Sequence, residues 1–311
     1  MYEKVSNTLE LSHDEWLQLR KTGIGGSDAG AVCGVNPFCS SISVYQDKTS
    51  DDLEEPDSEA MRQGRDLEEY VAKRFMEETG KKVRRTNYMY RNTEHPFMIA
   101  DVDRLVSGED AGLECKTASA WSEDKWKDGQ IPDHYIIQCM HYMAVLGLSR
   151  WYIAVVILGR DFKWACVERD EELIKNLISI ESDFWNNHVL PGIIPDPDGS
   201  EIYDDILQKY FKDVKKEKTI ELIGFDEELK RRQELLLLQD KLEAEKNAID
   251  QKLKLYMKDS EYAVNDRYRI SWSGVKKSSI DSKRLKEEQP DIYSKYLKSS
   301  EYRRFVVKES A

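Results

Sequence analysis

The sequence predicts an α/β protein in which a mixed β-sheet is flanked by helices. Between residues 59 and 189, helical periodicity and extended segments follow in the order helix, three strands, helix, strand, strand, helix. Residues 151–158 form a nearly continuous apolar run, which is typical of a strand buried on both faces. With 311 residues, of which 40% are hydrophobic, the chain can form one sizeable domain and a smaller module.

Each element of this order rests on a local pattern. Ser12 is suited to cap a first helix, and a glycine-rich turn follows at residues 23–28. Leu67, Val71 and Phe75 are spaced four apart, so they give the second helix one apolar face. Helices are therefore expected at about 12–22, 59–78, 132–146 and 171–189, and strands at about 83–91, 97–106, 112–117, 151–158 and 162–167.

After Pro197 the character of the chain changes. Residues 226–258 are highly charged and predict a coiled-coil-like helix or a helical hairpin, because four apolar side chains recur seven residues apart. They are Leu235, Leu242, Ile249 and Tyr256. A small α+β tail is expected beyond, with a strand at 268–273, a helical stretch near 282–297 and a strand at 304–308 that could pair with the first. We therefore divide the chain into a larger domain at 1–211 and a C-terminal module at 212–311.

Charge is distributed unevenly between these two parts. The net charge of the whole chain is −12, which by itself does not suggest a nucleic-acid-binding protein. Residues 212–311 carry 24 Lys and Arg against 20 Asp and Glu, a net of +4, and residues 1–211 carry −16. An acidic domain can still bind DNA if metal ions and a local basic lining offset phosphate repulsion.

Several classes of protein are disfavoured by the composition. No apolar run approaches the roughly 18 residues that a membrane-spanning helix needs. Residues 1–10 contain no apolar segment of the kind that signal peptides carry. The five cysteines include no CxxC pair, which argues against a disulfide framework or a zinc site. We expect a cytoplasmic protein of a bacterial host or prophage.

Asp103, Glu114 and Lys116 are the candidate chemical groups. Residues two apart on a strand point to the same face, so Glu114 and Lys116 share one. A hairpin through residues 107–111 can bring Asp103 beside Glu114. Two carboxylates on neighbouring strands suit Mg²⁺, which takes few protein ligands and keeps several waters. A nearby lysine can orient the attacking water, or deprotonate it if its own pKa is lowered.

By spacing alone, this pattern could also be a salt-bridge set on an edge hairpin. Further features favour function: charged residues lie in an otherwise apolar strand, where unpaired charges are costly. Glu68 is expected on the preceding helix, with Gly64 one turn before it leaving room for close approach. Gln138, His141 and Tyr142 share a face of the following helix, where we expect His141 to be a packed residue and not a metal ligand.

Four stretches, in this order, make the chain resemble the YqaJ-like viral recombinases, relatives of the phage lambda alkaline exonuclease. The resemblance covers about residues 12–195. The stretches are Trp16 with Leu19-Arg20 and Gly23-Ile24-Gly25-Gly26-Ser27-Asp28, then Gly64-Arg65-Asp66-Leu67-Glu68, then residues 99–106 with Leu113-Glu114-Cys115-Lys116, and finally Gln138 with His141-Tyr142-Met143.

The resemblance implies a restriction-endonuclease-like fold of the PD-(D/E)xK nuclease superfamily and Mg²⁺- or Mn²⁺-dependent cleavage of DNA. Lys116 resembles the catalytic lysine and Gln138 the glutamine of the last motif. The implied metal ligands are Asp103, Glu114, the Cys115 carbonyl and Glu68. Arg20 matches an arginine that grips a 5′-phosphate, with Ser27 nearby. Relatives often have Pro-Asp-Gly where this chain has Val102-Asp103-Arg104, which leaves open whether Asp101 or Asp103 leads the metal site.

The resemblance further implies a 5′→3′ exonuclease that acts on double-stranded DNA ends. Its product would be a 3′ single strand for an annealing protein of the RecT or Beta kind. A homo-oligomer is expected, most simply the ring-shaped trimer of lambda-type exonucleases. Two other functions stay open: an endonuclease or structure-specific nuclease on the same core, and a DNA-end-binding scaffold without catalysis.

Overall fold

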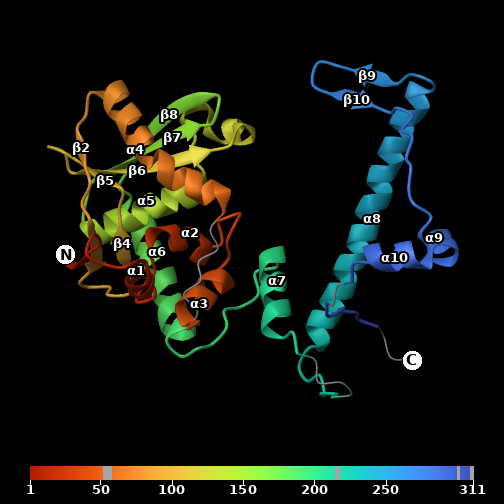
Figure 1. Cartoon of the computed structure of the whole chain (residues 1–311), viewed down its shortest axis with the longest axis horizontal. Coiled ribbons are helices and arrows are strands. Elements are labelled where there is room, and N and C mark those ends of the chain that lie inside the picture. The colour runs from red at the N-terminus through yellow and green to blue at the C-terminus, as the bar shows by residue number, and fades with distance from the viewer. Residues whose placement is uncertain (52–57, 214–217, 300–301, 309–311) are drawn as a thin grey trace. The chain divides into compact units, whose positions relative to one another are not determined.

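The structure, a computed structural model, describes residues 1–51, 58–213, 218–299 and 302–308 (Figure 1). The chain divides into two compact units, Met1–Phe211 and Lys212–Ala311. Within the described residues, no helix combines the length and apolar composition needed to cross a membrane.

The first unit contains most of the secondary structure. In chain order its elements are β1 Tyr2–Asn7, α1 His13–Arg20, α2 Gly26–Val32, α3 Ser41–Thr49, α4 Glu59–Thr79, β2 Val83–Arg84, β3 Tyr88–Asn92, β4 Ile99–Asp101, β5 Arg104–Val106, β6 Ala111–Ala118, the 3-10 segment η1 Ala120–Gly129, α5 Asp133–Leu146, β7 Arg150–Ile157, β8 Asp161–Glu168, α6 Glu171–Phe184, the π-helical turn η2 Trp185–Val189 and α7 Glu201–Tyr210.

A five-stranded sheet in the order β2-β5-β6-β7-β8 forms the centre of this unit. The pair β6 and β7 is parallel, while the other pairs are antiparallel. A second, three-stranded sheet has the order β1-β3-β4. The expected mixed sheet is thus confirmed.

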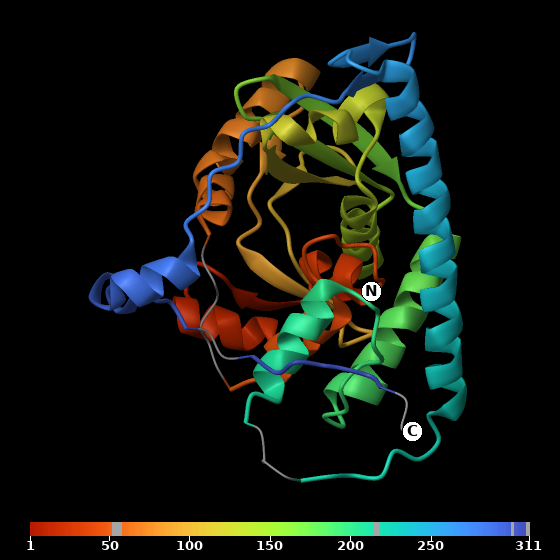
Figure 2. The ribbon, with the colours of Figure 1, turned by 90° about the vertical axis from the view of Figure 1, so that its right-hand side faces the viewer.

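Helices cover both faces of the five-stranded sheet (Figures 1 and 2). On one face, Val71 and Phe75 of α4 pack in a cluster with Leu113 of β6. On the other face, α5 and α6 pack in the larger cluster, which includes Ile153 and Val155 of β7. Because β7 contributes to both clusters, its expected burial on both faces is confirmed.

Two segments that the sequence predicts as single strands are each divided. Residues 83–91 give β2 and β3, separated by a turn in which Asn87 has a φ of 52°. Residues 97–106 give β4 and β5, which belong to different sheets. Asp103 lies at the point where the chain leaves one sheet and enters the other, so its side chain is not fixed by a regular ladder.

The second unit contains α8 Asp226–Met257, β9 Tyr262–Val264, β10 Arg269–Ser271, α9 Ser282–Glu288 and α10 Pro290–Tyr296. Residues 226–257 form one long helix and not a helical hairpin, and the helical stretch expected near 282–297 is confirmed as α9 and α10, but the strand expected at 304–308 is wrong. Instead β10 pairs antiparallel with β9, and residues 304–308 form no strand. Asn265 accepts hydrogen bonds from the amides of Arg267 and Tyr268 and so closes a short turn. Closing that turn costs less entropy than closing a loop of thirty residues.

Candidate active site

Asp103 and Glu114 lie side by side, as the hairpin argument predicts. The antiparallel register of β5 and β6 sets Arg104 opposite Leu113, one residue from each carboxylate. The Cys115 amide donates a 2.7 Å hydrogen bond to Asp103 Oδ2. Leu113 and the partly buried Cys115 contribute to the cluster on the α4 side, whereas Glu114 reaches Gln138 of α5 on the other side.

Glu114 is the most constrained of these carboxylates. Its side chain is buried, and its Oε1 accepts hydrogen bonds from Lys116 Nζ at 2.6 Å and Gln138 Nε2 at 2.8 Å. Gln138 also donates to the Tyr142 hydroxyl at 2.9 Å. The second oxygen, Oε2, is buried and has no hydrogen-bond partner among the residues that the structure describes. A buried acceptor without a partner is costly, so this oxygen is suited to a ligand.

Lys116 is held as a cation. Burial lowers the pKa of its ammonium group, but the charge of Glu114, with smaller contributions from Tyr135 and Asp103, outweighs burial and raises the pKa overall. The ammonium also lies 4.8 Å from the centre of the Tyr135 ring. The lowered pKa that a lysine base would need is therefore not found here, and Lys116 is suited to orient water or to stabilise negative charge.

Three carboxylates influence one another at this point. Burial, then Glu114 and then Glu68, raise the pKa of Asp103 well above its ordinary value. No group of three His, Cys, Asp or Glu side chains converges as a preformed metal cage in the part of the chain that the structure describes. Asp103 and Glu114 nevertheless fit Mg²⁺ or Mn²⁺, because Mg²⁺ sites often use one or two carboxylates and complete their coordination with water and phosphate.

Glu68 lies near Asp103 but is bound by arginines. Arg104 Nη1 donates to Glu68 Oε1 and, at 2.7 Å, to the Asp103 carbonyl. Arg104 Nη2 donates to Glu69 Oε2 at 2.9 Å, and Arg85 Nη2 lies 3.6 Å from Glu68 Oε1. Sequence reasoning treated Arg104 only as a departure from the family pattern. Its position beside Asp103 in an apolar strand was the available signal that it is buried.

Two hollows meet at the carboxylates. One, of about 370 Å³, is lined by Arg20, Ser27 and Asp101, and the other, of about 790 Å³, by Glu114 and Lys116. Glu68 and Asp103 line both hollows. The structure therefore places the predicted phosphate-binding residues and the predicted catalytic residues in two hollows that share Glu68 and Asp103.

Asp101 and Asp103 have different partners. The Trp16 indole N–H donates a 2.9 Å hydrogen bond to Asp101 Oδ2, and the Arg20 guanidinium lies over the Trp16 ring at 4.9 Å. Asp103 is the aspartate that meets β6 through the Cys115 amide. Asp101 thus lines only the hollow that contains Arg20, whereas Asp103 lines both hollows.

The glycines at the site differ in whether a side chain would fit in their place. A Cβ on Gly26 would lie 2.4 Å from the Tyr142 ring, and one on Gly23 would lie 2.7 Å from the Phe97 carbonyl oxygen. These two positions are required for packing. A Cβ on Gly64 would lie 3.7 Å from Thr117 Oγ1, an ordinary contact, so the expected need for close approach there is wrong.

His141 faces away from the carboxylates, although it shares a helix with Gln138. Its Nδ1 lies 2.7 Å from Glu181 Oε1, and its Nε2 donates to the Ile99 carbonyl at 2.9 Å. Both side chains of this pair are fully buried. The expectation that His141 is a packed, hydrogen-bonded helix residue is confirmed.

The sequence of the chain was compared with those of known proteins and protein families. The YqaJ-like viral recombinase domain matches residues 15–149. The protein YqaJ of Bacillus subtilis (strain 168) is 40% identical over 313 residues, covering 99% of this chain and 98% of that protein.

Two solved structures show a weaker similarity. An alkaline exonuclease from Laribacter hongkongensis is 21% identical, with a TM-score of 0.48 over 56% of this chain and 91% of that one. A phage-related exonuclease from Haemophilus somnus 129PT is 14% identical, with a TM-score of 0.41 over 55% of this chain and 97% of that one. Because the Bacillus protein matches along almost the whole chain, the chain belongs to the YqaJ-like viral recombinase family.

Proposed function

We propose that this chain is a Mg²⁺- or Mn²⁺-dependent deoxyribonuclease that degrades duplex DNA from its 5′ ends. The observation that carries the proposal is the grouping of Asp103, Glu114 and Lys116, in which one buried Glu114 oxygen has no hydrogen-bond partner. Membership of a viral recombinase family supports DNA as the substrate.

Asp103 and Glu114 would hold the metal ion, with Glu68 and the Cys115 carbonyl as further candidate ligands. When bound, a divalent ion stabilises charge on the phosphate and lowers the pKa of coordinated water. Gln138 orients Glu114 by donating to its Oε1, which leaves Oε2 available. Lys116 stays protonated beside Glu114, from where its ammonium can orient the attacking water and stabilise the developing negative charge.

Arg20 and Ser27 give the proposed activity its polarity. The hollow that they line also reaches Asp103, so a terminal 5′-phosphate bound there would leave the next phosphodiester near the carboxylates. A guanidinium makes strong, charge-assisted hydrogen bonds to phosphate. Degradation from the 5′ end leaves a 3′ single strand, the substrate of a single-strand annealing protein, which is the partner that we propose.

Incubation of linear and covalently closed circular duplex with Mg²⁺ tests this function. An exonuclease degrades the linear DNA and spares the circles, and Lys116→Ala should be inactive on both. Cleavage of the circles would instead favour an endonuclease on the same core. DNA binding without metal-dependent turnover would favour a scaffold.

We further propose that residues 1–211 are the nuclease domain and residues 212–311 a docking module, and that the protein forms a homotrimer. A ring with a basic lining would reconcile the net charge of −16 in the nuclease domain with DNA binding. Light scattering should give the mass of a trimer at micromolar concentration. A strict monomer would contradict the proposal.

A further inference from the structure

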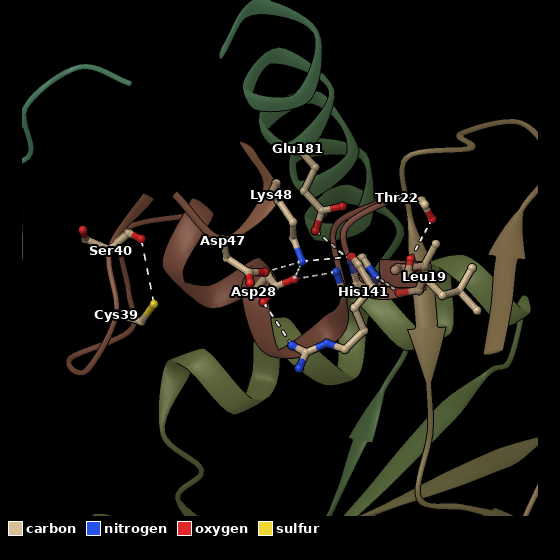
Figure 3. Close-up of polar contacts among 12 residues, drawn as sticks. Leu19, Thr22, Asp28, Cys39, Ser40, Asp47, Lys48, His141 and Glu181 are labelled. Atoms are coloured by element: carbon tan, nitrogen blue, oxygen red, sulfur yellow. Dashed lines mark hydrogen bonds and ion pairs between the residues drawn. The ribbon is translucent and has the colours of Figure 1, made fainter. Parts of the chain in front are cut away.

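Lys48 is a lysine whose side chain is completely buried. It lies on α3, and its ammonium is within 2.8 Å of Asp28 Oδ2 and 3.1 Å of Asp47 Oδ2 (Figure 3). It also donates a 3.1 Å hydrogen bond to the carbonyl of Arg20 at the end of α1. A buried ammonium is costly unless it is paired and hydrogen-bonded, so this one is tied to a defined set of acceptors.

Asp28 extends the contacts of Lys48 into the proposed phosphate site. Its Oδ2 accepts a 2.9 Å hydrogen bond from the Gly25 amide, and its Oδ1 lies 3.8 Å from the Arg20 guanidinium. Burial alone would raise the pKa of Asp28, but the charges of Lys48 and Arg20 outweigh burial and lower the pKa. The carboxylate therefore stays ionised.

Lys48 thus reaches Arg20 in two ways. It binds the Arg20 main chain directly, and through Asp28 it reaches both the Arg20 guanidinium and the backbone of the glycine turn. Neither Lys48 nor Asp28 lines the hollow that Arg20 and Ser27 share. These residues can therefore act on a ligand there only through Arg20 and the turn.

We propose that Lys48 and Asp28 are positioning residues that fix Arg20 and the Gly25–Ser27 turn for the terminal 5′-phosphate of a DNA end. The inference rests on the proposed role of Arg20 in binding that phosphate. It adds a buried ion pair, absent from the hollow itself, as a determinant of specificity for phosphorylated ends.

A purely structural role is the competing explanation, and a double variant separates the two. Asp28→Asn/Lys48→Met removes both charges, so no unpaired charge is left buried and folding is preserved. If the pair only joins α1, α2 and α3, this variant keeps the preference for phosphorylated ends. If the pair positions Arg20, the preference falls although the protein is folded.

The measured quantity is the ratio of kcat/KM for linear duplex with 5′-phosphate to that with 5′-hydroxyl ends, in the full-length protein. We expect the double variant to reduce this ratio about tenfold, through a higher KM for phosphorylated ends. A small displacement of Arg20 is enough to weaken its hydrogen bonds to the 5′-phosphate. The kcat at saturating DNA should change little. Circular dichroism and thermal melting show whether the variant is folded.

Lys21→Met is the matched control. Lys21 is the neighbour of Arg20, and its ammonium also joins α1 to the end of α3, through a 2.6 Å hydrogen bond to the Ser50 carbonyl. Asp28 has its hydrogen bond and ion pairs with Gly25, Arg20 and Lys48, and none of them, in the described part of the chain, involves Lys21. This variant should therefore keep the wild-type ratio. An equal loss in Lys21→Met would show that any loosening of α1 suffices, which overturns the specific role of Lys48 and Asp28.

Arg20→Ala distinguishes failure of the inference from failure of the proposed function. If Arg20→Ala keeps the wild-type preference, or if the wild type has none, the phosphate-binding role of Arg20 is wrong and the inference is wrong with it. If Arg20→Ala loses the preference and the double variant keeps it, only the inference is wrong. If the double variant does not fold, Lys48→Gln retains a donor for the Arg20 carbonyl and should lower the ratio severalfold. An unchanged ratio in Lys48→Gln would then overturn the inference.

Discussion

The two units of the chain differ in which side chains are buried and which are exposed. In the first unit, Lys48, Arg104, Glu114 and Glu181 are buried charged groups inside an apolar core. In the second unit, Met257 is the single buried apolar side chain among the described residues, and the leucines of α8 are exposed.

This difference supports the proposed division into a nuclease domain and a docking module. Buried charges are costly and persist where they form paired networks or functional sites, and here they surround the proposed site. Exposed apolar side chains in quantity are typical of a surface that contacts another molecule. The first unit is therefore suited to cleavage, and the second, with its net charge of +4, to docking.

The largest expected effect belongs to the buried charges at the carboxylate pair. Lys116→Ala and Glu114→Ala should each lower kcat on the order of 10²-fold or more, because these groups act mainly on the transition state. DNA binding and the melting temperature of Lys116→Ala should stay near wild type. Single-turnover cleavage of linear duplex, with binding measured in Ca²⁺, separates the two effects. Near wild-type turnover by Lys116→Ala would remove the lysine from the mechanism.

A smaller effect, on stability, is expected at the buried pair of His141 and Glu181. Burial lowers the pKa of His141, but Glu181 and the Ile99 carbonyl outweigh burial and raise it, while burial raises the pKa of Glu181. A raised pKa in the folded state contributes stability at low pH that is lost as pH rises through the raised value. Glu181→Gln should therefore cost about 2 kcal/mol near pH 6 and less near pH 9.

Urea unfolding of both proteins at the two pH values measures this difference. Asp183→Asn is the control, because Asp183 lies on the same helix but is exposed, and it should show no such pH dependence. A cost for Glu181→Gln that grows with pH would show that the pair is not held by a protonated histidine.

The sequence predicted most of the first unit because its signals are local. Helical spacing, the Ser12 cap and the apolar run of β7 each specify one element, and the two-residue spacing of Glu114 and Lys116 specifies a shared face. The break between β4 and β5 was not predicted, because apolar residues continue on both sides of Asp103 and no glycine or proline marks the change of sheet there. Helices α2, α3 and α7 were also missed, since each is short and depends on tertiary packing.

Contacts between distant residues were the other part that the sequence could not supply. Lys48 and Asp28 are twenty residues apart and carry no pattern that pairs them, and the same is true of Arg104 with Glu68. In the second unit, an alternation of apolar residues fitted two different strand pairings, and the local turn at Asn265 decided between them.

Deletion of residues 212–311 tests the division of roles directly. The hydrophobic clusters of the described residues lie entirely before residue 208, so the remaining unit should fold and keep metal-dependent cleavage. Affinity for DNA, or for the annealing protein, should fall. A salt titration separates these, because lost phosphate contacts reduce the slope of log affinity against log salt, while a lost protein interface changes it little. An insoluble product, or two unchanged affinities, would contradict the docking role.

The smallest effect, on stability, is expected for a substitution on α8, and it tests directly how the two units differ. The side chain of Leu242 is 59% exposed, whereas Leu113 is fully buried against α4. Leu113→Ala should cost about 2–5 kcal/mol of unfolding free energy, since it leaves a cavity in the core. Leu242→Ala removes the same atoms but should cost less than about 0.5 kcal/mol, because water already covers much of this side chain. Urea unfolding gives both values, and light scattering of the same samples gives the mass of the assembly. If Leu242→Ala lowers that mass, or destabilises the protein as much as Leu113→Ala does, α8 is buried against another copy of the chain and its apolar stripe forms part of the assembly.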